Sequence, residues 1–350
     1  MMGLIWFWLV TLILALYVIL DGFDLGVGSL HFFLARTSEE REISLRTIGP
    51  VWDGNEVWLI AGGGTLYFAF PLLYASAFSG FYLPLMIVLW LLILRGIGIE
   101  LRMHIHVNVW QDFFDGTFAL SSALLAIFLG AALANVIRGV PLGPSNYFFL
   151  PLWTNWRTGA YPGIIDWYTV LGGVLALVAL AVHGAFYFAI KTEGELQLRA
   201  RGAVKVMWPA LVVLTMLSLA ATIHIRPGSL SNYVHYPVAF AIPLAVFFTL
   251  GLMRYFSARG QDKRGFLCTS LYLATMLTGA AFGLYPTLMP STLGSSYDIT
   301  VANALSGHHG LSIGLIWWGF GMLLAAGYFI FVYRMFRGKV PSTTGQHGYL

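Results

Sequence analysis

Charged side chains within long apolar stretches are the residues of this chain whose types and spacing could do chemistry. A charge inside a membrane span costs roughly 2.5–3.5 kcal/mol on insertion scales, so it normally faces a bundle interior or a water path. Carboxylates beside an arginine in such a place can take up and release protons, which favours a role in proton transfer. Eight such residues lie in or at the ends of the first four apolar stretches: Asp21, Asp24, Asp53, Glu56, Arg95, Glu100, Asp112 and Asp115.

The composition indicates what kind of protein must position these charges. Of 350 residues, 58% are hydrophobic and only 10% are charged, whereas a soluble domain carries about 25% charged residues. Only helices and closed barrels can span lipid, because every backbone polar group there needs a partner, and the alternating polarity of barrel strands is absent. The sequence therefore predicts an all-α polytopic membrane protein, and its formal net charge of +4 gives no reason to expect a nucleic-acid partner.

Nine stretches are long and apolar enough to be spanning helices, which need about 20 mostly apolar residues. We predict a first half at residues 1–138 with four spans and the buried charges, an outer connecting loop at 139–165, a second half with five spans at 166–337, and a cytoplasmic tail at 338–350. This division predicts two four-helix bundles plus one extra helix. The predicted spans lie near residues 4–34, 50–74, 79–101, 117–138, 166–190, 203–224, 236–256, 266–289 and 309–336.

Lysine and arginine are unequally divided between the two sides of the predicted helices. Of the 19 such residues, one side holds only Arg138, Arg157 and Arg226, and the other side holds the rest. Because cytoplasmic loops are enriched in lysine and arginine, the N-terminus is predicted outside and the C-terminus in the cytoplasm. At a rise of about 1.5 Å per residue, Asp21 and Asp24 fall in the cytoplasmic half of the first span. The other six charges fall at a similar depth, so the sequence predicts that all eight converge near the cytoplasmic side.

The stretch WDGNEVW, residues 52–58, opens the second span with three polar side chains between two tryptophans. We expect Asp53 to lie at the mouth of a proton route, with Asn55 holding its hydrogen bonds. Trp52 and Trp58 are expected to seat the helix at the membrane interface. The structural alternative is that Asp53 caps the first turn of this helix, where a carboxylate can accept hydrogen bonds from free N–H groups.

Histidine and cysteine give little support for a cofactor site in this chain. His183 is the one histidine deep inside a span, which makes it the candidate heme ligand, although a lone buried histidine is more often an interhelical hydrogen bonder. No HExxH motif or cysteine–histidine spacing typical of a metal site occurs, and Cys268 is the only cysteine. We therefore expect no bound metal.

Several ordered blocks of the sequence resemble subunit II of the cytochrome bd quinol oxidases. They run from about residue 4 to residue 336 and read LDGFDLGVG, GPVWDGNEVWLIAGGG, FPLLYASAFSGFYLPL, LRGIGIELR, GELQLRARG and YPTLMPSTL. The resemblance implies a prokaryotic inner-membrane enzyme that oxidises a membrane quinol and reduces dioxygen to water. It also implies a heterodimer whose other chain, subunit I, carries the b-type hemes, heme d and the quinol site, while subunit II carries no heme.

The same resemblance implies roles for individual residues. It puts Asp53 on a cytoplasmic proton path, with Asp24, Arg95 and Asp115 as further members. Glu56 stands where some members of the family have glutamine. The resemblance further implies a structural quinone in subunit II of some members, and membrane lipids and a small single-helix third subunit are further partners to test for.

A proton-coupled secondary transporter is the main alternative, because it too would need buried carboxylates with an arginine counter-ion. Broken helices at matching positions of two halves would favour a transporter, and no convincing pair is found in the sequence. A heme-binding membrane subunit that uses His183 is a third hypothesis.

Overall fold

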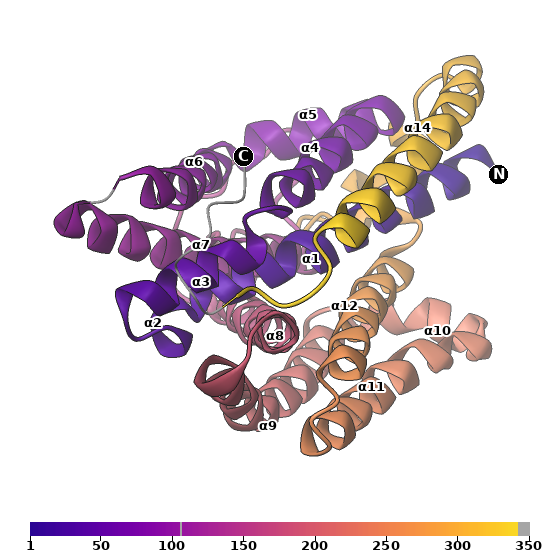
Figure 1. The fold of residues 1–350 in the computed structure, drawn as a ribbon. Helices are drawn as coiled ribbons and strands as arrows, with labels where there is room; N and C mark the ends of the chain where they lie inside the picture. The colour runs from indigo at the N-terminus through magenta and orange to yellow at the C-terminus, as the bar shows by residue number, and fades with distance from the viewer. Residues whose placement is uncertain (106, 342–350) are drawn as a thin grey trace.

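The computed structural model describes residues 1–105 and 107–341. Within them the chain is almost entirely helical (Figure 1), which confirms the predicted all-α polytopic class. Two short strands, β1 (Thr287–Met289) and β2 (Ile299–Thr300), form an antiparallel pair. Residues 342–350 of the predicted cytoplasmic tail lie outside the described residues.

Among the described residues, eight helices are long and apolar enough to cross a membrane. Each coincides with a predicted span. They are α1 (Met2–Ser29), α6 (Tyr82–His104), α7 (Asn108–Arg138), α8 (Trp167–Lys191), α9 (Gly194–Ile225), α11 (Ala241–Ala258) with the preceding turn η2 (Pro237–Phe240), α12 (Asp262–Leu284) and α14 (His308–Met335).

The predicted second span is interrupted. It begins as α4 (Trp52–Ala69) and continues, after a break at Phe70, as α5 (Pro71–Gly80). Helix α4 is too polar to count among the eight apolar helices, because it opens with aspartate, asparagine and glutamate and contains three consecutive glycines. The total of nine spans and the division into two four-helix bundles with one extra helix therefore stay predictions.

The remaining helices are short connections at the ends of the long ones. Between α1 and α4 the chain forms α2 (His31–Leu34) and α3 (Ser38–Ile48). Helix α3 starts with a capping box, in which the Thr37 hydroxyl accepts from the Glu40 N–H and the Glu40 carboxylate accepts from the Thr37 N–H. The others are η1 (Pro227–Leu230), α10 (Ser231–His235), η3 (Ser295–Tyr297) and α13 (Val301–Ala304).

Helix α8 lies at the centre of the molecule, packed against α1, α7, α9 and α12 (Figure 1). Its crossing with α1 depends on two glycines. A Cβ atom on Gly26 would lie 1.9 Å from the carbonyl oxygen of Leu180, and one on Gly184 would lie 2.4 Å from the carbonyl carbon of Gly26. No side chain fits at such distances, so small residues let the two backbones approach closely.

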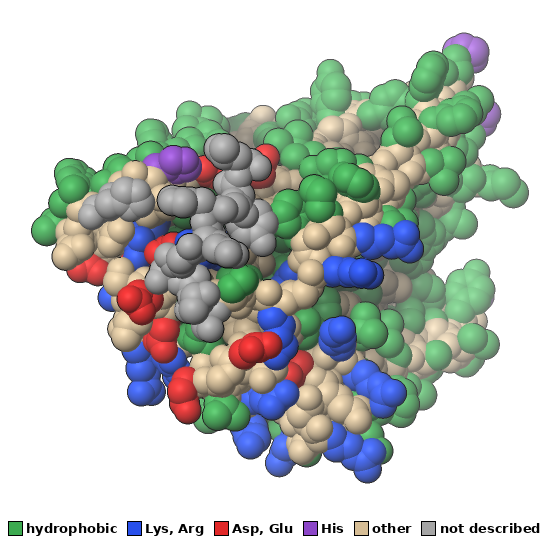
Figure 2. All heavy atoms as spheres, viewed as in Figure 1, with side chains coloured by type: hydrophobic (Ala, Val, Ile, Leu, Met, Phe, Trp, Pro, Cys, Tyr) green, Lys and Arg blue, Asp and Glu red, His purple; other side chains and the backbone are tan. Residues whose placement is uncertain are grey.

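Charged side chains gather at one end of the molecule, around α2, α3 and the ends of α9 and α12, while hydrophobic side chains cover most of the rest of the visible face (Figure 2). Helices α1, α6 and α14 end at this side and α4 and α7 begin there. At the opposite end of α7, Arg138 forms a buried ion pair with Asp166, which precedes α8. That pair links the two ends of the connecting segment, residues 139–165.

Candidate functional site

A buried ion pair between Asp21 and Arg95 forms the centre of the charge cluster. Arg95, on α6, donates to both carboxylate oxygens of Asp21 on α1, and its Nη1 lies 2.9 Å from Asp21 Oδ2. Neither side chain has any exposed surface. Glu56, in the second turn of α4, brings its Oε2 to 3.8 Å from the same guanidinium. Loss of either partner of the pair would leave an uncompensated charge in an apolar interior.

Asp24, one helical turn further along α1, is held by an amide rather than by a cation. Asn55 on α4 donates from Nδ2 to Asp24 Oδ2 at 2.8 Å, and the hydroxyl of Tyr333 on α14 donates to Asn55 Oδ1 at 2.9 Å. Asp24 and Asn55 are completely buried. The other carboxylate oxygen of Asp24 has no hydrogen-bond partner within the described part of the chain. It can therefore receive a proton without breaking a hydrogen bond to the protein.

Asp53 lies in the first turn of α4 with an exposed side chain. No described residue gives it a hydrogen bond or an ion pair, and it caps no backbone N–H, so the capping alternative is wrong. The expectation that Asn55 holds Asp53 is also wrong, since Asn55 bonds to Asp24 instead. Asp53 is thus an open carboxylate on a surface that the chain presents outward.

Asp115, near the start of α7, belongs to a separate cluster. Its Oδ1 accepts from Arg102 Nε at 2.9 Å and lies 3.1 Å from His31 Nε2, while its Oδ2 accepts from Arg41 at 3.1 Å. Arg41 also pairs with the exposed Asp112 at 2.8 Å. These contacts join α2 and α3 to α6 and α7, so the cluster fixes the connection between the first two predicted spans.

The eight charges identified in the sequence lie at one end of the helices but do not form one site. The inner group is Asp21, Asp24, Glu56 and Arg95, and the second group is Asp112 and Asp115. Asp53 and Glu100 are exposed and belong to neither group. The prediction that the eight charges lie at one end of the molecule is therefore correct. The prediction that they come together in a single cluster is wrong. Asp53 in particular is separate from the buried carboxylates, because they lie on the inward face of the bundle.

Some members of the two clusters were missed in the sequence. Arg102 could have been found, because it follows Arg95 by seven residues, which is two helical turns and therefore the same helix face. Asp21 was identified, and its three-residue spacing from Asp24 also places the two on one helix face. Tyr333 carried no such signal, since its contact with Asn55 joins positions 278 apart and depends on how the last span folds back.

His183 is buried and fully hydrogen-bonded. Its Nε2 lies 2.9 Å from the carbonyl oxygen of Ile19 and its Nδ1 lies 2.6 Å from the Thr269 hydroxyl. Its ring also stacks on Phe266 at a centroid distance of 4.6 Å. Both nitrogens are engaged between helices, so this geometry fits an interhelical hydrogen bonder and does not fit an axial heme ligand. The described residues contain no group of three or more histidine, cysteine, aspartate or glutamate side chains placed to hold a metal ion.

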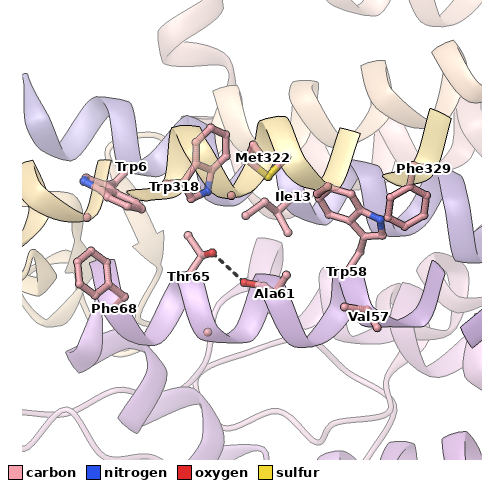
Figure 3. A pocket seen from close by; sticks show the side chains of 14 residues that line it. Trp6, Ile13, Val57, Trp58, Ala61, Thr65, Phe68, Trp318, Met322 and Phe329 are labelled. Carbon is pink, nitrogen blue, oxygen red and sulfur yellow. Dashed lines mark hydrogen bonds between the residues drawn. The ribbon is translucent and has the colours of Figure 1, made fainter. Parts of the chain in front are cut away.

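Trp58 lines an open cavity beside α4, and its expected place at the membrane interface stays a prediction. The cavity, of about 490 Å³, lies between α1, α4 and α14 and is almost entirely apolar (Figure 3). Trp6 and Trp318 also line it, and none of the three indole N–H groups has a hydrogen-bond acceptor among the described residues. Trp52 is half-buried, with its ring against α6 at Gly96. The cavity therefore suits an apolar molecule.

Comparisons with known proteins agree over nearly the whole chain. The family described as cytochrome bd terminal oxidase subunit II matches residues 2–336. Subunit 2 of the cytochrome bd-I ubiquinol oxidase of Escherichia coli K12 is 32% identical over 339 residues, covering 88% of this chain and 87% of that protein. Subunit 2 of the cytochrome bd ubiquinol oxidase of Bacillus subtilis is 32% identical over 310 residues, covering 88% of each chain.

A solved structure shows the same fold. A chain of the bd oxidase from Geobacillus thermodenitrificans superposes with a TM-score of 0.77, covering 96% of this chain and 98% of that chain, at 16% sequence identity. At that sequence identity the comparison shows a shared arrangement of helices and nothing about function.

Proposed function

The chain belongs to the cytochrome bd terminal oxidase subunit II family, and from this premise we propose that it supports a heme-bearing subunit I and contributes a cytoplasmic route for proton uptake. The observation that carries the proton role is the buried cluster of Asp21, Arg95 and Asp24 at one end of the bundle. Membership of the family favours this function over a proton-coupled transporter, which the buried charges also allowed.

We assign different steps of proton transfer to the exposed Asp53 and to the buried cluster. Reduction of dioxygen to water consumes protons, and taking them from the cytoplasm requires groups that exchange protons through the protein. Asp53 is exposed and has no partner among the described residues, so we assign it proton uptake from outside the fold. Asp24 has one free buried oxygen and is assigned proton exchange inside the bundle. Arg95 neutralises Asp21, so the pair adds no net charge beside Asp24.

Asp115 lies at the edge of this route. Its carboxylate is engaged by His31, Arg41 and Arg102, which leaves less freedom for proton exchange than Asp24 has. We assign it the role of holding α3 against α6 and α7, so that the open side of the route keeps its shape.

The surface of α4 is the part of the chain that we assign to contact with subunit I. Helix α4 is too polar to face lipid along its length, and its exposed side carries the Asp53 carboxylate next to large apolar side chains such as Val57 and Ile60. A charge exposed to hydrocarbon is costly, whereas a partner protein beside it would keep lipid away and leave the carboxylate open to water. A Cβ atom on Gly63 would meet nothing within 4 Å, so the chain leaves room there for another helix to approach.

We propose that the hemes of the complex lie in subunit I and that this chain holds none. The support is the geometry of His183, which has no nitrogen free for a metal. The test is a visible absorption spectrum of the isolated chain and of the complex. The proposal predicts heme absorption only when subunit I is present, and an isolated chain with stoichiometric heme that is lost in His183→Ala would contradict it.

The cavity between α1, α4 and α14 is the place where this chain could hold a structural quinone. Its apolar walls would hold the isoprenoid part of the molecule. Organic extraction of the purified complex, followed by mass spectrometry, should recover one quinone more than the catalytic site explains. A Gly321→Trp variant, which fills the cavity, should lose that molecule, and retention of it would contradict the assignment.

We place the chain in the bacterial inner membrane with its N-terminus outside and its C-terminus in the cytoplasm. The excess of lysine and arginine on the side of α3 supports this orientation. Reporter fusions after residue 36 and within segment 139–165 test it. A cytoplasmic reporter active at residue 36 and inactive in the segment is expected, and the opposite pattern would overturn the orientation.

The assembled complex provides the experiment for the function as a whole. Quinol oxidase turnover should appear only when this chain and subunit I are produced together, and it should fall when Asp53 or Asp24 is replaced by asparagine while heme content is kept. Full turnover in both variants would contradict the proton role and leave the support of subunit I intact.

A further inference from the structure

Tyr333 reaches the buried carboxylates from the far end of the chain. It lies in the last turn of α14, and its hydroxyl donates to Asn55 Oδ1 at 2.9 Å. Among the described residues, this is the only hydrogen bond that a side chain of α14 makes to another helix. It joins the last span to α4 at the point where α4 also contacts α1.

The two ends of the Asn55 amide differ chemically. Its oxygen is an acceptor only and its NH₂ group is a donor only. Because the Tyr333 hydroxyl donates to Oδ1, both N–H bonds lie at the other end of the amide, where one of them meets Asp24 Oδ2 at 2.8 Å. The tyrosine hydroxyl thus fixes the orientation in which Asn55 can hold an ionised Asp24.

Asp24 depends on this support more than Asp21 does. Asp21 is held at both oxygens by the guanidinium of Arg95, whereas Asp24 has one donor, a neutral amide, for its two oxygens. If the amide of Asn55 rotates, Asp24 loses that donor and faces an acceptor instead. The position of Asp24 therefore rests on whatever holds Asn55.

We propose that Tyr333 is a positioning residue for Asp24, acting through Asn55. The proposal rests on the proton route assigned to Asp24 above. Tyr333 itself carries no proton in this scheme, because Asn55 stands between the two groups and an amide does not relay protons at neutral pH. The hydroxyl instead keeps the Asp24 carboxylate in the place from which it exchanges protons.

The first experiment compares Tyr333→Phe with Tyr328→Phe in the assembled complex. Tyr328 is on the same helix, is exposed, and makes no side-chain hydrogen bond to the described residues, so it controls for loss of a tyrosine hydroxyl. Infrared difference spectra between oxidised and reduced complex give the carboxyl band of Asp24, identified by its loss in Asp24→Asn. We expect this band to shift in Tyr333→Phe and to stay in place in Tyr328→Phe.

Turnover provides the second measurement. Loss of one hydrogen bond should slow quinol oxidation in Tyr333→Phe by about fivefold, with heme content unchanged. In an Asn55→Ala background, Tyr333→Phe should have no further effect, because the residue through which it acts is already gone. Should the Asn55→Ala complex fail to assemble, the band shift in Tyr333→Phe decides the question.

Three results would overturn the proposal: an unchanged Asp24 band with full turnover in Tyr333→Phe, an equal loss of turnover from Tyr333→Phe with and without Asn55, or the absence of any Asp24-dependent band in the unaltered complex. Failure of the proton route itself is a distinct result. An Asp24→Asn complex with full turnover would refute the route at Asp24, while a shifted band in Tyr333→Phe would still support the positioning.

Discussion

The guanidinium of Arg95 is bound to both carboxylate oxygens of Asp21, and neither side chain has any exposed surface. The pair joins α6 to α1 at the end of the bundle where Asp24 and Glu56 also lie. Its two charges cancel, so the pair itself adds no net charge to a region where an unpaired charge would be costly.

Replacing Arg95 by glutamine should therefore destabilise the complex strongly. Asp21 would lose its counter-charge in an apolar interior, and removing one partner of a buried pair costs about 3–5 kcal/mol. The measurement is the free energy of unfolding of the purified complex, followed through the heme spectrum. Arg46→Gln is the matched control, because Arg46 pairs with Glu42 near the surface, and such a pair contributes about 0.3–0.5 kcal/mol. Equal stability of the two variants would contradict a structural role for the buried pair.

Assembly with subunit I should depend on the open glycines of α4. A Cβ atom at Gly63 would meet nothing within 4 Å among the described residues, so a loss caused by a larger side chain there points to a partner. We expect Gly63→Leu to reduce the yield of assembled complex severalfold, since overpacking a close contact costs about 1–3 kcal/mol. Gly251→Leu is the control, because a Cβ atom on Gly251 of α11 likewise meets nothing within 4 Å. Native mass spectrometry measures the yield, and a normal yield for Gly63→Leu would place the interface elsewhere.

The ion pair of Glu40 with Arg199 should make stability depend on pH on the acid side. The hydrogen bond from Arg199 lowers the pKa of Glu40 from its usual value to about 2. A carboxyl whose folded-state pKa is lowered stabilises the fold above its ordinary pKa, and this contribution is lost as pH falls toward about 2. The melting temperature of the complex should therefore exceed that of Glu40→Gln at pH 5, and the difference should shrink as pH falls below about 4. A difference that stays constant from pH 5 to pH 3 would contradict this.

Much of the fold could be predicted from the sequence because hydropathy is a local property. Eight long apolar stretches are helices at the predicted places, and the charges were correctly expected at one end of the bundle. The second span was harder to define, because the polar start and the glycines of α4 weaken its apolar character and α5 follows directly after Phe70. The proposed contact of α4 with subunit I could not be predicted from a local pattern, because it involves a surface outside this chain.

The site was predicted in its residue types and only partly in its pairings. Asp24 and Arg95 were chosen because they are charges inside spans, and both are buried. Their partners could not be chosen the same way, since Asn55 was assigned to its neighbour Asp53 and bonds to Asp24 across a helix interface. Side-chain direction decides this, because residues two apart on a helix face different ways.

The central claim is that carboxylates of this chain supply protons for dioxygen reduction, and turnover per heme in Asp53→Asn tests it most directly. Asparagine keeps the shape of aspartate but cannot carry a proton, so quinol oxidase turnover should fall by about an order of magnitude or more, as expected when a proton-transfer group is lost. Heme spectra of the same preparation should be unchanged, and Asp53→Glu should retain part of the rate. Glu100, on α6, is an exposed carboxylate at the same end of the molecule as Asp53. Glu100→Gln should therefore leave turnover near that of the unaltered complex. Full turnover per heme in Asp53→Asn would contradict the account.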